Sequence, residues 1–298
     1  MPERFMDRLA CAVAGKRSSV CVGLDPLPAK LPADVWPDGQ RSGDPAQQAR
    51  AVLEFNRRVI DAVCESAVAV KPQIAFYERL GAAGWLAYVR TIEAAHRKGL
   101  IVIGDIKRGD IGSTAAAYAE AHLGTGAEYA DAITLNPLFG SDGLQPFIER
   151  AQQTGAGLYL LVRTSNPSAA ELQDLAADGQ PLYLWIARLL SKLMGSWTRT
   201  GRYHDLGAVV GATNPEQLRV LRAALPRAPF LLPGYGAQGA SARDCLPAFD
   251  ADGNGALVNS SRGIIYAFES APHMPWQAAV AQAAERMRDD LPPRRCSS

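Results

Sequence analysis

The residues best suited to acid–base chemistry follow a short apolar run at 100–103. Asp105 and Lys107 stand two residues apart, and because side chains alternate along a strand they are expected on one face, with Cβ atoms about 6–7 Å apart. Lys71 ends a second apolar run, and Asp110 completes an alternating set of four charges. Each charge then has an opposite neighbour, which favours a preorganised site with a charged Lys107 that donates a proton rather than a neutral Schiff-base amine.

Simpler interpretations exist for the same residues. Asp105 and Lys107 could form an ordinary surface ion pair, and Asp110 could be no more than the cap of a helix that also carries Thr114 one turn later. Two inward-facing charges at the end of an apolar strand are poorly explained in this way, because buried charge is costly without a purpose. The pattern therefore favours a functional site over a structural ion pair.

Two glycine-rich turns near the end of the chain are suited to binding phosphate. The first, 234–239, contains Gln238, and the second contains Arg262 and Gly263. Backbone N–H groups in such turns bind anions, the planar guanidinium of Arg262 matches phosphate oxygens, and Gln238 adds a neutral donor. One glycine-rich turn alone is usually only a turn, but two in succession indicate a phosphate site.

Composition excludes several classes of protein. The 298 residues include 31 Lys and Arg against 30 Asp and Glu, a net charge of +1, so no basic surface for DNA, RNA or an anionic membrane is indicated. Five scattered cysteines lack a Cys-x-x-Cys pair and four dispersed histidines lack metal-ligand spacing, so we expect reduced thiols and no zinc site. Without a signal-peptide pattern or an apolar run of ~18–20 residues, the sequence predicts a cytoplasmic protein with no membrane span.

Eight apolar strands alternate with helices in the order of a (β/α)₈ barrel, a TIM barrel of the α/β class. No linker interrupts them, so residues 1–298 are predicted to form a single domain with a disordered tail from about 290. The strands are expected at 18–25, 67–73, 100–107, 132–137, 157–165, 206–213, 229–236 and 256–263, with helices at 47–66, 82–97, 110–123, 143–153, 181–198 and 275–288. A doubly wound open sheet is the alternative, but its Gly-x-Gly-x-x-Gly turn is absent after the first strand.

The remaining segments have predicted roles around that barrel. A helix ending at Lys16 is expected to close the bottom of the barrel, and 26–45 and the segment after Ser165 are expected to be loops. Barrel active sites lie at the carboxyl ends of the strands, which is where Asp25, Lys71 and Ser165 fall.

The sequence resembles the orotidine 5′-monophosphate decarboxylase family, in its longer bacterial branch. The motifs that carry the resemblance are Asp105-Ile106-Lys107-Arg108-Gly109-Asp110-Ile111-Gly112-Ser113-Thr114, Gly23-Leu24-Asp25-Pro26, Val70-Lys71-Pro72, Thr164-Ser165-Asn166-Pro167, Pro233-Gly234-Tyr235-Gly236-Ala237-Gln238 and Asn259-Ser260-Ser261-Arg262-Gly263. They cover nearly the whole barrel in order, and no catalytic position departs from the family pattern.

The resemblance implies a decarboxylation that uses no metal and no cofactor, and it assigns the catalytic roles. Lys107 would stabilise the carbanion at C6 and protonate it, while Asp105 would stand beside the substrate carboxylate. Lys71 and Asp110 would hold the charged array in place. A homodimer with shared active sites is implied, with Asp110 and Thr114 reaching across from the partner subunit.

The same resemblance assigns the binding roles. Asp25 would bind the ribose hydroxyls and Ser165 the pyrimidine edge of orotidine 5′-monophosphate. Gln238 and Arg262, with Gly263 in the same turn, would bind its phosphate. Two other functions remain open: a Mg²⁺-dependent sugar-phosphate decarboxylase or aldolase of the same barrel superfamily, and a nucleotide-phosphate sensor without catalytic activity.

Overall fold

The computed structural model describes residues 3–197 and 201–292, which contain a closed barrel of eight strands. Around the barrel the order is β1-β10-β9-β8-β5-β4-β3-β2, and every neighbouring pair is parallel. The strands are β1 (Val20–Leu24), β2 (Ala69–Pro72), β3 (Ile101–Arg108), β4 (Ala132–Leu135), β5 (Gly157–Arg163), β8 (Leu206–Val210), β9 (Phe230–Pro233) and β10 (Ala256–Ser260). The predicted (β/α)₈ barrel is confirmed, and the open-sheet alternative is wrong because β10 pairs with β1.

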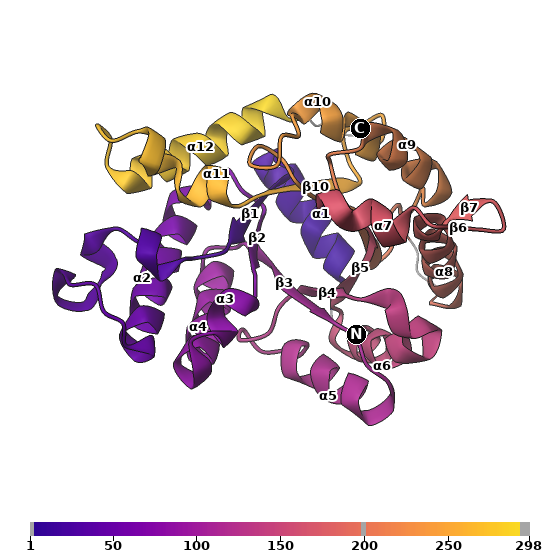
Figure 1. The fold of residues 1–298 in the computed structure, drawn as a ribbon, viewed down its shortest axis with the longest axis horizontal. Helices are drawn as coiled ribbons and strands as arrows, with labels where there is room; N and C mark the ends of the chain where they lie inside the picture. The colour runs from indigo at the N-terminus through magenta and orange to yellow at the C-terminus, as the bar shows by residue number, and fades with distance from the viewer. Residues whose placement is uncertain (1–2, 198–200, 293–298) are drawn as a thin grey trace.

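Helices surround the strands on the outside and, in one case, cover an end of the barrel (Figure 1). They are α1 (Phe5–Lys16), α2 (Pro45–Val63), α3 (Ala75–Glu78), α4 (Gly81–Arg97), α5 (Gly112–His122), α6 (Gly140–Thr154), α7 (Ala170–Gln173), α8 (Leu182–Ser196), α9 (Pro215–Ala224), α10 (Ala242–Cys245), α11 (Arg262–Ile265) and α12 (Trp276–Asp290). Within the described residues, no helix is both long enough and apolar enough to cross a membrane.

The alternation of side chains along the strands divides the core into two parts. Val102 and Ile106 face outward into the apolar layer between barrel and helices, whereas Ile101 and Ile103 face into the barrel. On the inward face the next residue of this series is Asp105, at the carboxyl end of β3. The core thus supports the charged end of β3 with apolar packing from below.

Helix α1 closes the bottom of the barrel, as predicted. Its apolar stripe, Phe5, Leu9 and Val13, is buried against inward-facing strand residues, and the Phe5 ring meets the Tyr159 ring edge-on at 6.0 Å between centroids. In Figure 1 this indigo helix lies in the middle of the ring of outer helices.

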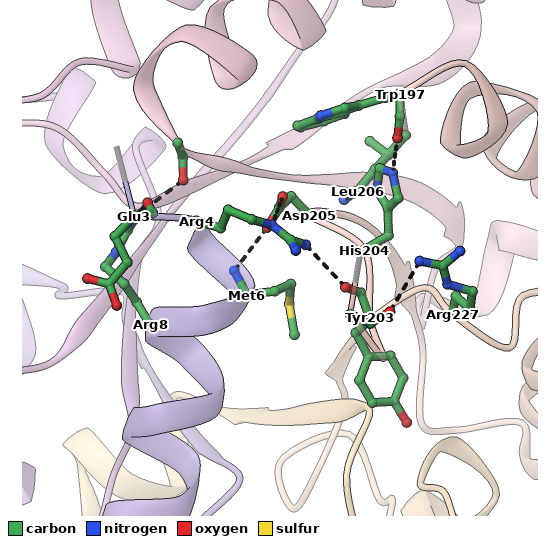
Figure 2. A network of polar contacts seen from close by, with 12 residues as sticks. Glu3, Arg4, Met6, Arg8, Trp197, Tyr203, His204, Asp205, Leu206 and Arg227 are labelled. Atoms are coloured by element: carbon green, nitrogen blue, oxygen red, sulfur yellow. Dashed lines mark hydrogen bonds and ion pairs between the residues drawn. The ribbon is translucent and has the colours of Figure 1, made fainter. Parts of the chain in front are cut away.

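The first turn of α1 is capped from a distant part of the chain. Asp205, 1% exposed, accepts hydrogen bonds from the Met6 N–H at 3.0 Å and from Arg4 Nε at 3.1 Å (Figure 2). No side chain caps this helix locally, so a carboxylate beside β8 satisfies one of its free N–H groups. The contact fixes α1 to the barrel.

The structure corrects the predicted start of the helix after β3. Helix α5 begins at Gly112, with Ile111 extended before it, so Asp110 precedes the helix and does not share a helical face with Thr114. Gly112 has a φ of +51°, which glycine adopts without steric cost. Strand β3 itself runs to Arg108, one residue beyond its predicted end, with a shift in its pairing to β4 after Gly104.

Two predicted loops contain short regular elements. Three 3₁₀ turns occupy the segment after Asp25, at Pro28–Lys30, Ala33–Val35 and Pro37–Gly39. The segment after Ser165 contains a 3₁₀ turn (Pro167–Ala169), α7 and the two-stranded antiparallel sheet of β6 (Ala176–Ala177) and β7 (Gln180–Pro181). These elements are too short for a periodic apolar pattern to reveal them.

The predicted disordered tail falls largely outside the described residues. Helix α12 continues to Asp290, and Leu291 after it is only 3% exposed. Residues 293–298 are not described, and neither is residue 198 at the predicted end of α8.

Candidate active site

The charged site is built around one buried carboxylate, that of Asp105. Its Oδ2 accepts from Lys71 Nζ at 2.5 Å and from Gln73 Nε2 at 3.0 Å, and its Oδ1 accepts from Lys107 Nζ at 2.5 Å and Thr134 Oγ1 at 2.9 Å. Asp105 is 6% exposed and Lys71 also 6%, whereas the Lys107 side chain is 43% exposed. The array is therefore buried on the Lys71 side and open at Lys107.

Three neighbouring strands bring these groups together. Lys71 and Gln73 are two residues apart at the end of β2, so they share a face, and Gln73 forms a backbone bridge with Asp105 on β3. Thr134 lies on β4, where its hydroxyl also accepts the N–H of Lys107 at 3.0 Å. Lys107 has a φ of +48°, a conformation that is strained for a residue with a side chain. Strand alternation alone therefore does not place it; the irregular end of β3 does.

The electrostatic interaction between Lys71 and Asp105 favours the charged form of both side chains. Burial opposes a charge on Lys71, but the carboxylates of Asp105 and Asp25 outweigh it and raise the pKa of Lys71 above its ordinary value. Burial likewise opposes the Asp105 carboxylate, but Lys71 and Lys107 outweigh it and hold the pKa of Asp105 well below its usual range. Asp105 is therefore an anion between two lysines across the neutral pH range.

A cavity of about 380 Å³ opens above this array, at the carboxyl ends of the strands. Lys71, Asp105 and Lys107 line it on one side, and Ser165 and Gln238 line it as well. Its size fits a small molecule, and its walls combine apolar side chains with a few convergent polar groups.

Asp25 lies beside the array at the end of β1. Its Oδ1 is buried and, among the described residues, has no hydrogen-bond partner. The negative charge of Asp25 nevertheless helps to raise the pKa of Lys71. A buried carboxylate oxygen without a donor is costly, so this atom is suited to accept from a ligand hydroxyl.

Four predicted site residues neither contact the charged array nor line the cavity. Among the described residues, the only side-chain hydrogen bond of Asp110 is from the neighbouring N–H of Ile111, at 2.8 Å, and Thr114 is exposed on α5. Arg262 and Gly263 are exposed at the start of α11, directly after β10. The structure thus brings Lys71, Asp105 and Lys107 together, and among the described residues no hydrogen bond or ion pair joins Asp110 to them.

Two members of the array were not among the predicted site residues, Gln73 and Thr134. The spacing of Gln73 from Lys71 was a usable signal, because residues two apart on a strand share a face. Thr134 had a weaker one, its place at the end of a predicted strand, since a threonine in a strand is most often only a β-branched residue that packs well.

A parallel eight-stranded barrel with a Lys–Asp–Lys array and a small-molecule cavity at its strand ends defines a class, the barrel enzymes that bind a substrate over the strand ends. The sequence profile of the orotidine 5′-phosphate decarboxylase / HUMPS family matches residues 18–271 of this chain. The chain belongs to that family.

Similar proteins agree over nearly the full length. The chain is 43% identical to the orotidine 5′-phosphate decarboxylase of Rhodopirellula baltica, over 96% of this chain and 98% of that one. It is 46% identical to the enzyme of the same name from Haloarcula marismortui, over 90% and 88%. The solved structure of Leishmania donovani OMP decarboxylase superposes with a TM-score of 0.75 at 35% identity, and covers 96% of each chain.

Proposed function

We infer that this protein decarboxylates orotidine 5′-monophosphate to uridine 5′-monophosphate and CO₂ in pyrimidine biosynthesis. The observation that carries this function is the buried Asp105 carboxylate between Lys71 and Lys107, at the strand ends of a chain that belongs to the orotidine 5′-phosphate decarboxylase family. When the bond from C6 to the carboxyl carbon breaks, its electron pair remains at C6 in the ring plane, where the π system cannot delocalise it. A fixed cation beside C6 is then the most direct stabilisation available.

Lys107 supplies that cation and the proton. Its Nζ is the exposed end of the array, so it can approach C6, donate a proton there and replace the departing CO₂ with hydrogen. Asp105 stands beside the substrate carboxylate and disfavours the bound ground state, while Lys71 holds Asp105 in place. The support is geometric: both lysines contact Asp105 at 2.5 Å.

The remaining predicted residues bind the rest of the substrate. Asp25 accepts from ribose hydroxyls, which fits its unpartnered buried oxygen. Ser165 contacts the pyrimidine edge, and Gln238, Arg262 and Gly263 bind the phosphate. Ser165 and Gln238 line the cavity, and Gly234, in the turn that carries Gln238, has a φ of +111°, a conformation that favours glycine.

Asp110 and Thr114 serve the active site of a second copy in a homodimer. Support comes from the separation of Asp110 from the array and from exposed apolar side chains nearby: Ile111 is 56% exposed, Leu138 77% and Phe139 47%. A Cβ atom placed on Gly143 would lie 2.6 Å from the Phe139 side chain and 2.8 Å from the Asp110 backbone oxygen, so these groups are close together. Exposed apolar side chains grouped in this way are typical of a protein interface.

The test is the loss of absorbance as orotidine 5′-monophosphate is consumed, with EDTA present. We expect full turnover. Activity that requires added Mg²⁺ would favour a sugar-phosphate decarboxylase or aldolase, and binding of uridine 5′-monophosphate without release of CO₂ would favour a nucleotide sensor. Independence from metal and cofactor, and a cytoplasmic location, remain predictions until these measurements and a localisation experiment are made.

A further inference from the structure

The segment between β5 and α8 comprises residues 164–181, and from residue 168 onward it lies outside the sequence motifs that identify the family. Its first three residues, Thr164, Ser165 and Asn166, all line the catalytic cavity. Its short helix α7 ends at Gln173, and the antiparallel pair β6 and β7 follows. Gln173 and the residue after it contact Thr164 and Arg163, the two residues that precede Ser165.

One side chain in this segment makes two hydrogen bonds to Thr164. Gln173 Oε1 accepts the backbone N–H of Thr164 at 2.8 Å, and Gln173 Nε2 donates to Thr164 Oγ1, also at 2.8 Å. The Thr164 hydroxyl in turn donates to Asn166 Oδ1 at 2.7 Å. Two bonds from one amide group fix the orientation of Thr164, because a single bond would leave it free to rotate.

Asp174, the residue after Gln173, fixes the position of Gln173 through an ion pair with Arg163. Arg163, the last residue of β5, donates from Nε to Asp174 Oδ1 at 3.1 Å and from Nη2 to Oδ2 at 3.2 Å. The Arg163 side chain is only 6% exposed and Asp174 is 34% exposed, so the guanidinium is buried while the carboxylate is partly open to water, and the two parallel bonds make the ion pair directional. Arg163 also donates from Nη1 to the Thr164 carbonyl at 2.9 Å.

Gly211 allows the backbone after β8 to pack closely against Ser165. A Cβ atom on Gly211 would lie 2.8 Å from Ser165 Cα, and the Gly211 N–H donates to the Arg163 carbonyl at 2.7 Å. Gly211 follows β8, so the neighbouring strand supports Ser165 from behind while Gln173 holds Thr164 from the other side.

We propose that Gln173 is a positioning residue that fixes Thr164 and thereby directs Ser165 toward the pyrimidine edge of the substrate. This rests on the role of Ser165 in the proposed function. Gln173 acts through Thr164, and its contribution is recognition of the base rather than of the phosphate.

Gln173→Ala tests this role by ligand discrimination. We expect it to weaken binding of uridine 5′-monophosphate by about 10-fold, since two hydrogen bonds are lost, and to leave binding of ribose 5-phosphate, which has no base, within about 2-fold. Gln173→Glu keeps the acceptor for the Thr164 N–H but loses the donor, so its loss should be intermediate. Leu172→Ala, an exposed position on the same helix, is the matched control and should change neither ligand.

A double-mutant cycle with Ser165→Ala separates positioning from general damage. If Gln173 acts through Ser165, the double variant should lose no more than about 2-fold beyond Ser165→Ala alone. Fully additive losses, or equal losses for both ligands, would overturn the proposal. Wild-type turnover is measured separately. If the wild type is active and the Gln173→Ala variant is unaffected, only the positioning role is contradicted. If the wild type neither turns over orotidine 5′-monophosphate nor binds uridine 5′-monophosphate, the proposed function is contradicted as well.

Discussion

Asp105 accepts four side-chain hydrogen bonds, and these explain how its carboxylate can remain charged although it is almost fully buried. Two of the donors are cations and two are neutral, Gln73 and Thr134. Burying the carboxylate alone would cost several kcal/mol, so the complete set of donors is what permits it. At the residue scale the protein thus places a fixed anion where a substrate carboxylate must bind, with a cation at the open side.

Lys107→Ala removes the cation and the proton donor together. We expect kcat to fall at least about 100-fold, because the charge is needed mainly where carbanion character develops, while binding of uridine 5′-monophosphate stays largely intact. Steady-state kinetics and a binding titration measure both. A variant that keeps more than about a tenth of the wild-type kcat, a loss under ~1.4 kcal/mol, would contradict the proposed mechanism.

Arg262→Ala should act mainly on binding, because the phosphate is remote from C6. The full substrate should lose considerably more in kcat/KM than a truncated substrate that lacks phosphate, since only the former has a group for Arg262 to hold. The comparison needs both substrates on both proteins. Equal losses would mean that Arg262 does not contact the phosphate.

Sequence predicted the charged residues better than their neutral partners. Asp105, Lys107 and Lys71 stand out because charge at the end of an apolar strand needs a reason. Gln73 and Thr134 do not, since uncharged polar residues at strand ends are common, and only the three-dimensional neighbourhood shows that they share one carboxylate.

At the scale of elements, the end of β3 and the start of α5 were the hardest to predict. Helix propensity and a possible cap at Asp110 suggested a helix from that residue, but Ile111 is extended and the helix starts at Gly112. The reason is local geometry: Gly112 adopts a positive φ, and Gly109 packs where a Cβ would lie 2.9 Å from the Asn136 carbonyl oxygen. Strand interiors were predicted well because their apolar runs are long and continuous.

The contact between His96 on α4 and Asp131 before β4 ties this helix to the barrel and makes the stability of the protein depend on pH. The ring nitrogens of His96 lie 2.8 Å from the Ala127 carbonyl and 2.9 Å from Asp131 Oδ2, so both can donate in the charged form. Burial disfavours that charge, but Asp131 outweighs it and raises the pKa of His96. Arg8 of α1 contacts the same carboxylate at 3.0 Å.

His96→Asn should therefore destabilise the protein in a pH-dependent way. A raised folded-state pKa gives stability that is fully present below the unfolded value of about 6.5 and is lost as pH rises through the folded value. We expect the difference in free energy of unfolding between wild type and variant to be larger at about pH 5.5 than at about pH 9. In an Asp131→Asn background the pH dependence should flatten, and a difference that instead grows with pH would contradict this assignment.

At the scale of the whole molecule, closing the barrel does two things for the site. It brings the ends of β1, β2, β3 and β4 side by side, so that Lys71, Asp105 and Thr134 line one cavity and Asp25 lies close enough to Lys71 to raise its pKa, although these residues span more than a third of the chain. Closure also creates a second end of the barrel, opposite the cavity, and α1 covers that end. The order of strands and helices predicted this arrangement, because a chain of alternating strands and helices with no linker has few other ways to bury all its strands.

The barrel of one chain nevertheless leaves Asp110 outside the charged array, and a mixing experiment tests whether a second chain uses it. Lys107→Ala and Asp110→Ala homodimers should each be inactive. In a mixed dimer with shared sites, one site carries both changes and the other carries neither, so activity returns. With random equimolar exchange of a two-fold dimer, half of the dimers are mixed and half of their sites are intact, which gives roughly a quarter of the wild-type signal. If exchange is demonstrated by differently tagged subunits and the mixture stays inactive, Asp110 serves its own chain and the shared site is wrong.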